Sequence, residues 1–274
     1  MTAAVETGTR AKIGLRDVGK VFRVRGADRP FTAISGVDLD IREGEFLTLV
    51  GPSGCGKSTL LDLIGGLTSP TSGQVLLDGA PVGGPGLDRG IVFQQYALFP
   101  WRTALANIAF GLEAKGVPRR ERADRARHYL DLVGLDGFGD RYPHELSGGM
   151  RQRVAIARSL AFDPDVLLMD EPFAALDAQT RESLQEELLH IWEKTRKTVV
   201  FITHGIDEAV YLGQRVAVMT ARPGRIKQII DIEFDSRAGD LRADPRFGEY
   251  RHRIWTLLRD EVAAAQREER NSVD

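Results

Sequence analysis

The sequence of 274 residues contains a single cysteine, carries almost no net charge and has no long hydrophobic run. One cysteine cannot form a disulfide within the chain, which excludes the disulfide-stabilised scaffolds of small secreted domains. The opening residues 1–10 lack the apolar core of a signal peptide. The longest stretch without a charged residue, 63–77, is interrupted by three glycines and a proline, whereas a membrane-spanning helix needs about 20 apolar residues. We therefore expect a soluble, cytosolic chain that reaches a membrane only through a partner.

Positive and negative side chains nearly cancel, with 37 Lys and Arg against 39 Asp and Glu and a formal net charge of -2. This balance excludes a generally basic surface of the kind that binds nucleic acid or anionic membranes. The length and the 42% hydrophobic composition allow one large domain or two small ones, and either could bury a substantial core.

Strand-like and helical patterns alternate through the middle of the chain. Residues 46–50 form a continuous apolar run, typical of a strand covered on both faces, and a glycine-rich loop and a helical pattern follow it. Further strand-like runs lie at 75–77, 91–93, 166–169, 199–203 and 216–219. This alternation predicts an α/β fold with a parallel sheet and crossover helices. Alternating apolar residues within 13–40 predict half-buried antiparallel strands ahead of it.

We expect one compact domain over 13–236, preceded by a flexible tail over 1–12 and followed by a helical tail over 237–274. Between about 103 and 160, helix-forming residues predominate and strand signals are few, which predicts an inserted helical subdomain. In the last segment, apolar residues recur at steps of three and four, as in an amphipathic helix: Phe247, Tyr250, Ile254, Leu258 and Val262. This apolar stripe either packs onto the chain's own body or contacts a partner.

A phosphate-binding loop is predicted directly after the run 46–50. The residues Gly51, Pro52, Ser53, Gly54, Cys55, Gly56, Lys57, Ser58 and Thr59 match G-x-x-x-x-G-K-[ST]. Glycines let successive backbone N–H groups point at phosphate oxygens, and the following helix adds its positive end. Lys57 can reach the β- and γ-phosphates, and the Ser58 hydroxyl is placed to bind Mg²⁺. The strand before the loop and the helix after it predict nucleotide binding.

Cys55 lies inside this loop, near the start of a predicted helix. Such a position can lower a thiol pKa and make a cysteine redox-active. The plainer interpretation is a small residue at a variable position, because the chain has no second cysteine to resolve an oxidised thiol.

Two acids, Asp170 and Glu171, end the apolar run 166–169. Open α/β sheets place ligands at the carboxyl ends of their parallel strands. There Asp170 could hold Mg²⁺ through water, while Glu171 could deprotonate an attacking water or only position it. A plain acidic turn after a strand is the alternative, and the phosphate loop elsewhere in the chain favours the functional interpretation.

Further segments resemble motifs of the ATP-binding subunits of ABC transporters. The residues 146–153 (LSGGMRQR) look like the family signature, and 90–94 (GIVFQ) look like its Q-loop. The residues 175–177 look like the D-loop, which ends on Asp177, and 202–204 like the segment that ends on the switch histidine, His204. The motifs follow the family's order, and the resemblance covers about 13–231.

This resemblance implies a P-loop NTPase (RecA-like) core with an antiparallel β subdomain and an inserted α-helical subdomain. It implies ATP and Mg²⁺ as cofactors and a homodimer in which each signature caps the ATP held by the other copy's phosphate loop. The implied roles are catalysis for Glu171, His204 and Gln94, metal binding for Ser58, Gln94 and Asp170, adenine stacking for Phe22, and contact with the partner's ATP for Ser147, Gly148 and Gly149.

Simpler interpretations remain open for several of these residues. Ser147 and Asp177 each precede a predicted helix and are suitable N-caps, and His204 alone would suit a packed or solvent-facing histidine. The chain also departs from the family pattern at Met150, where Gln is common, at Gly205, where Asp is frequent, and at Ala174, where Ser is common. None of these changes removes a phosphate, metal or water ligand, so we expect an active ATPase.

Other segments resemble the nitrate, sulfonate and taurine branch of importers: 101–104, 207–212, 221–226 and the tail pattern from Tyr250 to Val262. The apolar stretch 96–101 is a candidate anchor for an integral membrane permease subunit, although Leu98 and Phe99 could equally be core residues. The resemblance implies an extracytoplasmic solute-binding protein as a further partner, no nucleic acid, and a peripheral location on the cytoplasmic face of the membrane. An exporter or lipoprotein-release cassette, or a soluble ABC ATPase acting on ribosomes or nucleic acid, are the alternatives.

Overall fold

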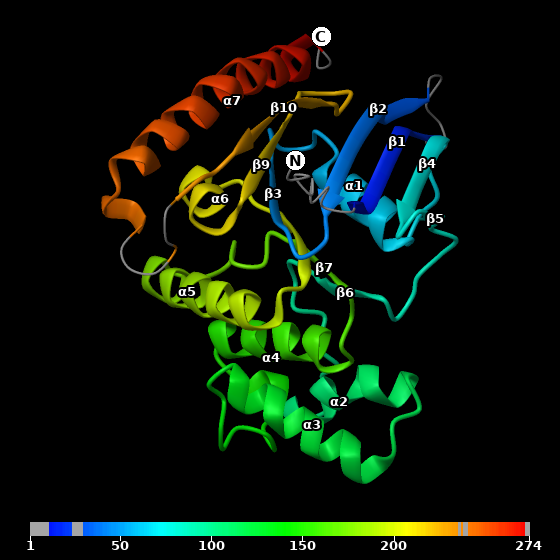
Figure 1. Ribbon diagram of the computed structural model, residues 1–274, viewed down its shortest axis with the longest axis vertical. Helices are drawn as coiled ribbons and strands as arrows, with labels where there is room; N and C mark the ends of the chain where they lie inside the picture. Colours follow the sequence, from blue (N-terminus) through cyan, green and yellow to red (C-terminus); the bar gives the residue numbers. More distant parts are fainter. Residues whose placement is uncertain (1–10, 24–29, 235–236, 238–240, 272–274) are drawn as a thin grey trace, which may run out of the picture.

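Two sheets and three groups of helices make up the chain (Figure 1). The computed structural model describes residues 11–23, 30–234, 237 and 241–271. Within this described part, no helix combines the length and the apolar character that crossing a bilayer requires. Of the predicted N-terminal tail, residues 1–10 lie outside the described residues, and Ala11 and Lys12 already belong to the first strand.

The larger sheet has six strands in the order β10-β9-β3-β8-β7-β6. Their bounds are β3 Phe46–Val50, β6 Arg89–Val92, β7 Val166–Asp170, β8 Thr198–Ile202, β9 Arg215–Met219 and β10 Ile226–Asp231. Neighbouring strands pair in parallel from β9 through β3, β8 and β7 to β6, and β10 pairs antiparallel with β9. The predicted parallel sheet is therefore confirmed, and β10 is an edge strand that the apolar runs did not reveal.

The smaller sheet is antiparallel, with the order β2-β1-β4-β5. Its strands are β1 Ala11–Phe22, β2 Phe31–Arg42, β4 Ser72–Leu77 and β5 Ala80–Pro81. The predicted antiparallel strands in 13–40 are confirmed. The run 75–77, which was grouped with the parallel strands, lies instead in β4, because it pairs with β1.

The inserted helices lie in the lower part of Figure 1. They are α2 Ala104–Ala114, α3 Arg119–Leu132, the short 3₁₀ helix η1 Pro143–Glu145 and α4 Gly148–Ala161. Thr103 caps α2 by accepting the N–H of Ala106, and the buried amide of Asn107 donates to the carbonyls of Phe99, Arg102 and Thr103. These bonds fix the start of the helical body where the chain leaves the sheet.

Apolar clusters cover both faces of the six-stranded sheet, since successive strand residues point to opposite faces. Phe46, Met169 and Phe201 face a cluster shared with α4 and the helices α5 Ala178–Thr195 and α6 Ile206–Leu212. Leu47, Leu168 and Val200 face the cluster shared with α1 Lys57–Gly65 and the antiparallel sheet. The parallel strands are thus buried on both faces, as their continuous apolar sequences predicted.

The C-terminal tail contains the 3₁₀ helix η2 Leu241–Ala243 and the long helix α7 Pro245–Asn271. Phe247 and Ile254 are buried in the larger cluster, and Tyr250 and Leu258 pack against it. Glu261 of α7 accepts the Ala221 N–H and pairs with Lys227. The amphipathic helix is confirmed, and four residues of its apolar stripe pack onto the chain's own body, whereas Val262 is 41% exposed.

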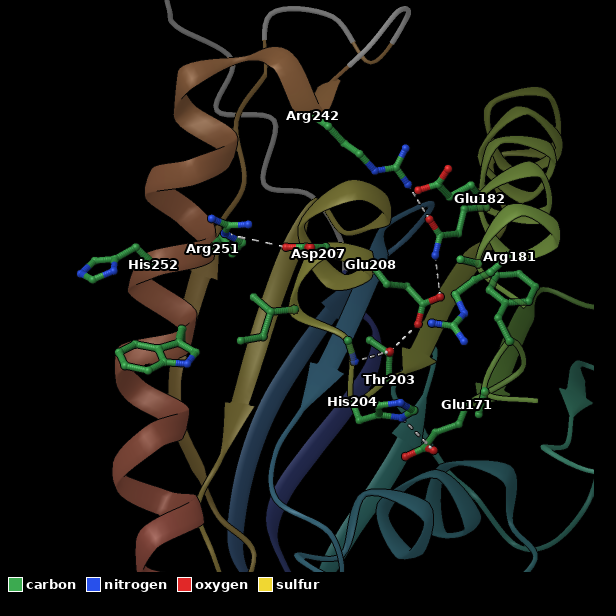
Figure 2. Close-up of a pocket in the computed structure, with 17 residues that line it drawn as sticks. Glu171, Arg181, Glu182, Thr203, His204, Asp207, Glu208, Arg242, Arg251 and His252 are labelled. Atoms are coloured by element: carbon green, nitrogen blue, oxygen red, sulfur yellow. Dashed lines mark hydrogen bonds and ion pairs between the residues drawn. The ribbon is translucent and has the colours of Figure 1, made fainter. Parts of the chain in front are cut away.

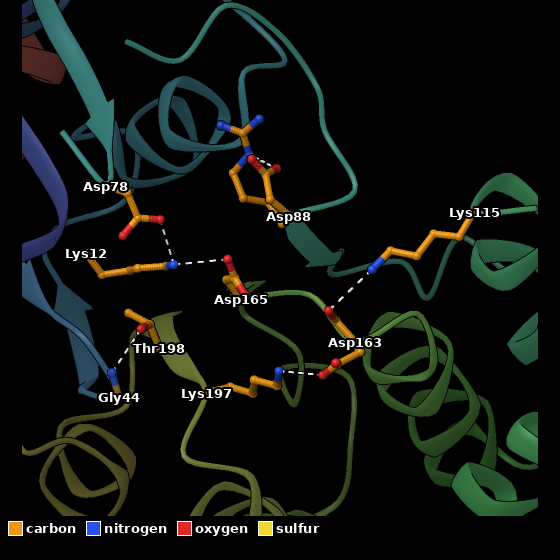
Figure 3. A network of polar contacts seen from close by, with 10 residues as sticks. Lys12, Gly44, Asp78, Asp88, Lys115, Asp163, Asp165, Lys197 and Thr198 are labelled. Carbon is orange, nitrogen blue, oxygen red and sulfur yellow. Dashed lines mark hydrogen bonds and ion pairs between the residues drawn. The ribbon is translucent and has the colours of Figure 1, made fainter. Parts of the chain in front are cut away.

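Lys12 joins the antiparallel sheet to the core through an ion pair on each side (Figure 3). Its Nζ lies 2.7 Å from Asp78 and 3.0 Å from Asp165, and only 8% of the side chain is exposed. Desolvation alone would lower the pKa of Lys12, but the hydrogen bonds and charges of the two aspartates raise it overall. The ammonium group therefore stabilises the fold at neutral pH, and this contribution disappears as the pH rises through its raised pKa.

Replacing Lys12 with Met is expected to lower the free energy of unfolding by about 1 kcal/mol, because both partner carboxylates remain partly hydrated. Urea unfolding at neutral pH measures the change. Lys194→Met, at an exposed position of α5, serves as the control and should leave the unfolding midpoint close to that of the parent. Equal midpoints for the two variants would show that the Lys12 pairs do not join the sheets.

Candidate functional site

Four neighbouring parallel strands bring the predicted catalytic motifs to one edge of the sheet. In the order β3, β8, β7 and β6, these strands lead into the phosphate loop, His204, Glu171 and the Q-loop glutamine, Gln94. Carboxyl ends of parallel strands meet at the same edge, where α/β sheets bind their ligands. The strand order alone therefore gathers residues that lie up to about 150 positions apart in the sequence.

The phosphate loop has a backbone that depends on its glycines. Gly54 and Gly56 have φ angles of 70° and 103°, in the region that favours glycine. A Cβ on Gly56 would lie 2.6 Å from the Ile34 side chain and 3.0 Å from the Ala33 carbonyl oxygen. The loop therefore curls against β2, and α1 begins directly after it at Lys57.

Lys57 is buried against its own loop. Its Nζ donates to the carbonyl oxygens of Gly51 and Pro52 at 2.9 and 3.0 Å. Ser53, Gly54 and Ser58 are exposed, so the loop presents its polar side to solvent. The ammonium group is thus held at the loop that would surround a phosphate, where a charge-assisted contact is strong.

Cys55 is buried, and this burial raises the pKa of its thiol, although the nearby charge of Lys57 opposes the shift. A reactive thiol needs a lowered pKa and access to solvent. The structure therefore favours the plainer interpretation of Cys55 as a small, packed residue of the loop.

Asp170 and Ser58 form the part of the site that suits a metal ion. Burial raises the pKa of Asp170, a hydrogen bond from Ser58 lowers it, and the charge of Glu171 raises it further. A nearby cation would relieve this cost of keeping the carboxylate charged. Mg²⁺ prefers hydroxyl and carboxylate oxygens and takes few of them from the protein, so these two residues fit the ion. Among the described residues there is no cluster of three or more His, Cys, Asp or Glu side chains that could hold a metal alone.

Glu171 and His204 point toward each other from adjacent strands, as Figure 2 shows, with 3.2 Å between His204 Nδ1 and Glu171 Oε2. The Glu171 N–H donates to the Ile202 carbonyl at 3.0 Å, and its φ angle is 44°. A glutamate in this left-handed region carries backbone strain, which often marks functional positions. The two candidate catalytic side chains are therefore brought together at the end of β7 and β8.

The signature residues lie away from the phosphate loop of the same chain. Ser147 caps α4 by accepting the Met150 N–H at 3.2 Å. A Cβ on Gly149 would lie 2.8 Å from the Thr180 side chain, at the start of α5. Figure 1 shows α4 and α1 in separate parts of the chain. Ser147, Gly148 and Gly149 are thus near the D-loop but not near Lys57.

Asp177 is the N-cap of α5. Its carboxylate accepts hydrogen bonds from the Thr180 N–H at 3.0 Å and the Thr180 hydroxyl at 2.8 Å, which hold its pKa below the usual value. The capping interpretation is confirmed, and an additional role in a dimer stays a prediction. Phe22 ends β1 opposite Phe31 and exposes 39% of its surface, and Gln94 is exposed after β6.

Arg222 is a contact of the phosphate loop that sequence reasoning missed. Its Nε donates to the Gly54 carbonyl at 2.8 Å, and its guanidinium lies 5.0 Å from the centre of the Phe31 ring. Segment 221–226 was interpreted only as a marker of an importer branch. Its Pro-Gly pair signals a turn, but no local pattern places that turn against the phosphate loop.

A cavity of about 830 Å³ lies between α5, α6 and α7, with Glu171 and His204 on its wall. Sequence reasoning also missed the polar residues that line it. Hydrogen bonds join Arg242 of η2, Gln185 of α5, Glu208 of α6 and Thr203, which directly follows β8 (Figure 2). The C-terminal tail therefore contributes to the surroundings of His204.

Sequence comparisons place these features in a known family. The ABC transporter family model matches residues 34–174. An uncharacterized ABC transporter ATP-binding protein of Methanocaldococcus jannaschii is 57% identical over 92% of this chain and 93% of its own. A taurine import ATP-binding protein of Rhizobium johnstonii is 50% identical over 88% and 95%, and a nitrate import ATP-binding protein of Synechocystis is 48% identical over 89% and 94%.

A solved structure gives the same result for the fold. The ADP- and phosphate-bound dimer of an ATP-binding cassette, described as a post-hydrolysis state, matches with a TM-score of 0.71 and 36% identity. The match covers 81% of this chain and 99% of the solved one, so about a fifth of this chain has no counterpart there. The predicted P-loop NTPase core is confirmed, and the chain belongs to the ABC transporter family as an ATP-binding cassette that hydrolyses ATP.

Proposed function

We propose that the chain is the energy-supplying subunit of a membrane importer for a small anionic or zwitterionic solute such as nitrate, a sulfonate or taurine. The observation that carries the proposal is the 48–50% identity, over most of the chain, to cassettes named for nitrate and taurine import. The cassette works from the cytoplasmic face of the membrane, to which integral permease subunits attach it, and an extracytoplasmic protein delivers the solute.

ATP binds along the loop 51–59 with its phosphates facing the backbone N–H groups. Lys57 leaves the carbonyls of Gly51 and Pro52 to contact the β- and γ-phosphates, since a phosphate oxygen is the stronger acceptor. The adenine stacks on the exposed ring of Phe22. Ser58, Asp170 and Gln94 would hold Mg²⁺, and the bound ion would supply positive charge beside the phosphates.

Hydrolysis depends on a water placed between the γ-phosphate and Glu171. The Glu171 carboxylate accepts a proton from that water or orients it. The hydrogen bond of the Glu171 N–H to the Ile202 carbonyl holds the backbone that presents this carboxylate. His204 Nδ1 lies 3.2 Å from Oε2 of the same carboxylate, and we expect the histidine to contact the γ-phosphate. Gln94 follows the edge strand β6 and links the nucleotide to the permease side of the cassette.

Two copies of the chain complete each site. Within one chain the signature residues lie beside the D-loop, while the phosphate loop belongs to another part of the molecule. In a twofold dimer, Ser147 and the N–H groups that follow it cap the ATP held by the partner. The free energy of binding two ATP molecules across this interface drives closure of the dimer and moves the permease subunits.

An exposed aromatic cluster is the permease-docking candidate. Trp101 is 71% exposed, and its ring centre lies 5.6 Å from that of Phe99, which in turn packs on Phe110 at 4.6 Å. Leu98 packs against the core. Phe99 and Trp101 thus form an anchored aromatic edge in the segment that follows Gln94, of the kind found at the centres of protein interfaces.

The replacement Phe22→Ala is expected to weaken ATP binding about tenfold, because stacking of a base on an aromatic ring contributes about 1–3 kcal/mol. Phe22→Tyr keeps the ring and should bind ATP like the parent. Phe138→Ala, which removes an exposed phenylalanine of the helical body, controls for surface effects. Titration with a fluorescent ATP analogue measures all three. Unchanged affinity in Phe22→Ala would exclude the stacking role.

Reconstitution tests the transport proposal. The chain is combined in liposomes with permease subunits and a solute-binding protein, and ATP hydrolysis is measured with nitrate, taurine, an alkanesulfonate or a sugar. We expect at least one of the first three solutes to stimulate hydrolysis and the sugar to have no effect. Hydrolysis that responds to none of them would contradict the importer branch, while basal hydrolysis would still support the ATPase assignment.

A further inference from the structure

A chain of hydrogen bonds runs from the C-terminal tail to the loop that carries His204 (Figure 2). Arg242 Nη2 of η2 donates to Gln185 Oε1 at 2.9 Å, and Gln185 Nε2 donates to Glu208 Oε1 at 2.8 Å. The Thr203 hydroxyl donates to the other Glu208 oxygen, and the Gly205 N–H donates to Thr203 Oγ1 at 2.9 Å. Gln185 and Thr203 donate directly to the Glu208 carboxylate, and Arg242 and Gly205 donate to these two residues. All four bonds therefore run in the direction of Glu208 and reinforce one another.

The central residues of this series of hydrogen bonds are shielded from water. Thr203 is 1% exposed and Gln185 is 4% exposed. Burial raises the pKa of Glu208, although its hydrogen bonds to Thr203 and Gln185 oppose that shift. A buried polar group that loses its partner pays the full cost of its lost hydration, and therefore the four side chains have little freedom to rearrange independently.

These hydrogen bonds fix the backbone on both sides of His204. The Thr203 hydroxyl holds the N–H of Gly205, so it bridges the histidine between them. Gly205 has ordinary angles of -86° and 115°, and no side chain of its own can hold the loop. The His204 side chain is 62% exposed, with Glu171 as its hydrogen-bond partner. Its position is thus set by the backbone that Thr203 and Glu208 hold.

The tail holds the other end of α6 as well. The Arg242 guanidinium lies 4.5 Å from the centre of the Tyr211 ring. Arg237 donates to the carbonyls of Tyr211 and Leu212 at 2.9 and 3.2 Å. Helix α6 begins directly after Gly205. The tail therefore contacts both ends of α6: Arg237 and Arg242 contact its last residues, and the hydrogen bonds through Gln185 reach Glu208 near its start. We call Arg242, Gln185, Glu208 and Thr203 the clamp. All four residues lie beyond the part of the chain that the family model matches, which ends at 174.

We propose that Arg242, Gln185, Glu208 and Thr203 are positioning residues, through which the C-terminal tail holds His204 at the distance from Glu171 that ATP hydrolysis requires. The proposal rests on ATP hydrolysis at this site and is independent of the transported solute. Small displacements of a catalytic group lower rates strongly. A loosened clamp should therefore lower the rate of hydrolysis while ATP still binds at the phosphate loop.

Steady-state hydrolysis by the full-length chain tests the clamp at both ends. We expect Gln185→Leu and Arg242→Leu each to lower kcat by about tenfold with KM for ATP within about twofold of the parent. Arg242→Lys keeps one donor for Gln185 and should recover part of the rate. Glu186→Leu on the same helix and Arg253→Leu on the tail change exposed residues and should leave kcat unchanged.

A double-variant cycle separates positioning from a general structural role. Single-turnover hydrolysis is compared in the parent, Gln185→Leu, His204→Ala and the combined variant, and the cycle is repeated with Arg242→Leu. If the clamp acts through His204, the combined variants are no slower than His204→Ala alone. Rate losses that multiply, or a kcat unchanged in both single variants, would overturn the proposal. If Gln185→Leu fails to fold, Arg242→Leu and its cycle decide the outcome, because Arg242 is less buried than Gln185.

Discussion

Glu171→Gln is expected to lower the rate of ATP hydrolysis by about 10³-fold, while ATP affinity stays within about twofold of the parent. Glutamine keeps the size of the side chain but cannot accept a proton from water. The backbone at this position has a φ angle of 44° and is held by the Ile202 carbonyl. The replacement therefore changes the chemistry at Oε2 without releasing the strained turn that presents it.

Phosphate release and binding of a fluorescent ATP analogue measure the two effects separately. Glu182→Gln is a matched control, because Glu182 lines the same cavity and is exposed on α5. The control should hydrolyse ATP like the parent. If Glu171→Gln hydrolysed ATP as fast as the control, the assignment of Glu171 as the base or water-positioning group would be wrong.

Lys57→Ala is expected to weaken ATP binding by about 100-fold, because it removes the buried ammonium group that we propose contacts the β- and γ-phosphates. The residue is 7% exposed, and we expect ATP to replace its two bonds to the loop carbonyls. The backbone angles of Gly54 and Gly56, with φ of 70° and 103°, also shape the loop. We therefore expect a folded chain whose loop no longer holds the triphosphate.

Isothermal titration with Mg-ATP measures this loss, and thermal unfolding without nucleotide shows whether the fold persists. Lys227→Ala removes a lysine of β10 that pairs with Glu261 of α7. That control should bind ATP like the parent. Near-parental ATP affinity in folded Lys57→Ala would contradict the assigned role of the loop lysine.

Local patterns predicted the parts of the site whose geometry is local. The phosphate loop combines spacing, a buried strand before it and a helix after it, and all three features lie within 20 residues. Asp177 and Ser147 were recognised as N-caps for the same reason, since the bond spans three positions. The carboxyl ends of β7 and β8 followed from apolar runs and the rule that parallel strands share an edge.

Long-range contacts could not be predicted in this way. The run 75–77 is equally apolar in either sheet, and only its pairing with β1 decides its place. Gln185 and Arg242 are separated by 57 positions, and no periodicity relates a glutamine inside a helix to an arginine in a tail. The contact of Arg222 with Gly54 spans 168 positions. These residues acquire their roles only when the helices pack.

We propose that the signature of a second copy completes each ATP site. Sedimentation velocity of Glu171→Gln chains with Mg-ATP tests it most directly, because slow hydrolysis preserves the ATP-bound form. We expect a particle of twice the single-chain mass for Glu171→Gln, and a single chain for the double variant Glu171→Gln/Ser147→Arg, which should still bind ATP at its own phosphate loop. An unchanged single-chain mass in the first case, or equal dimer formation in both, would contradict it.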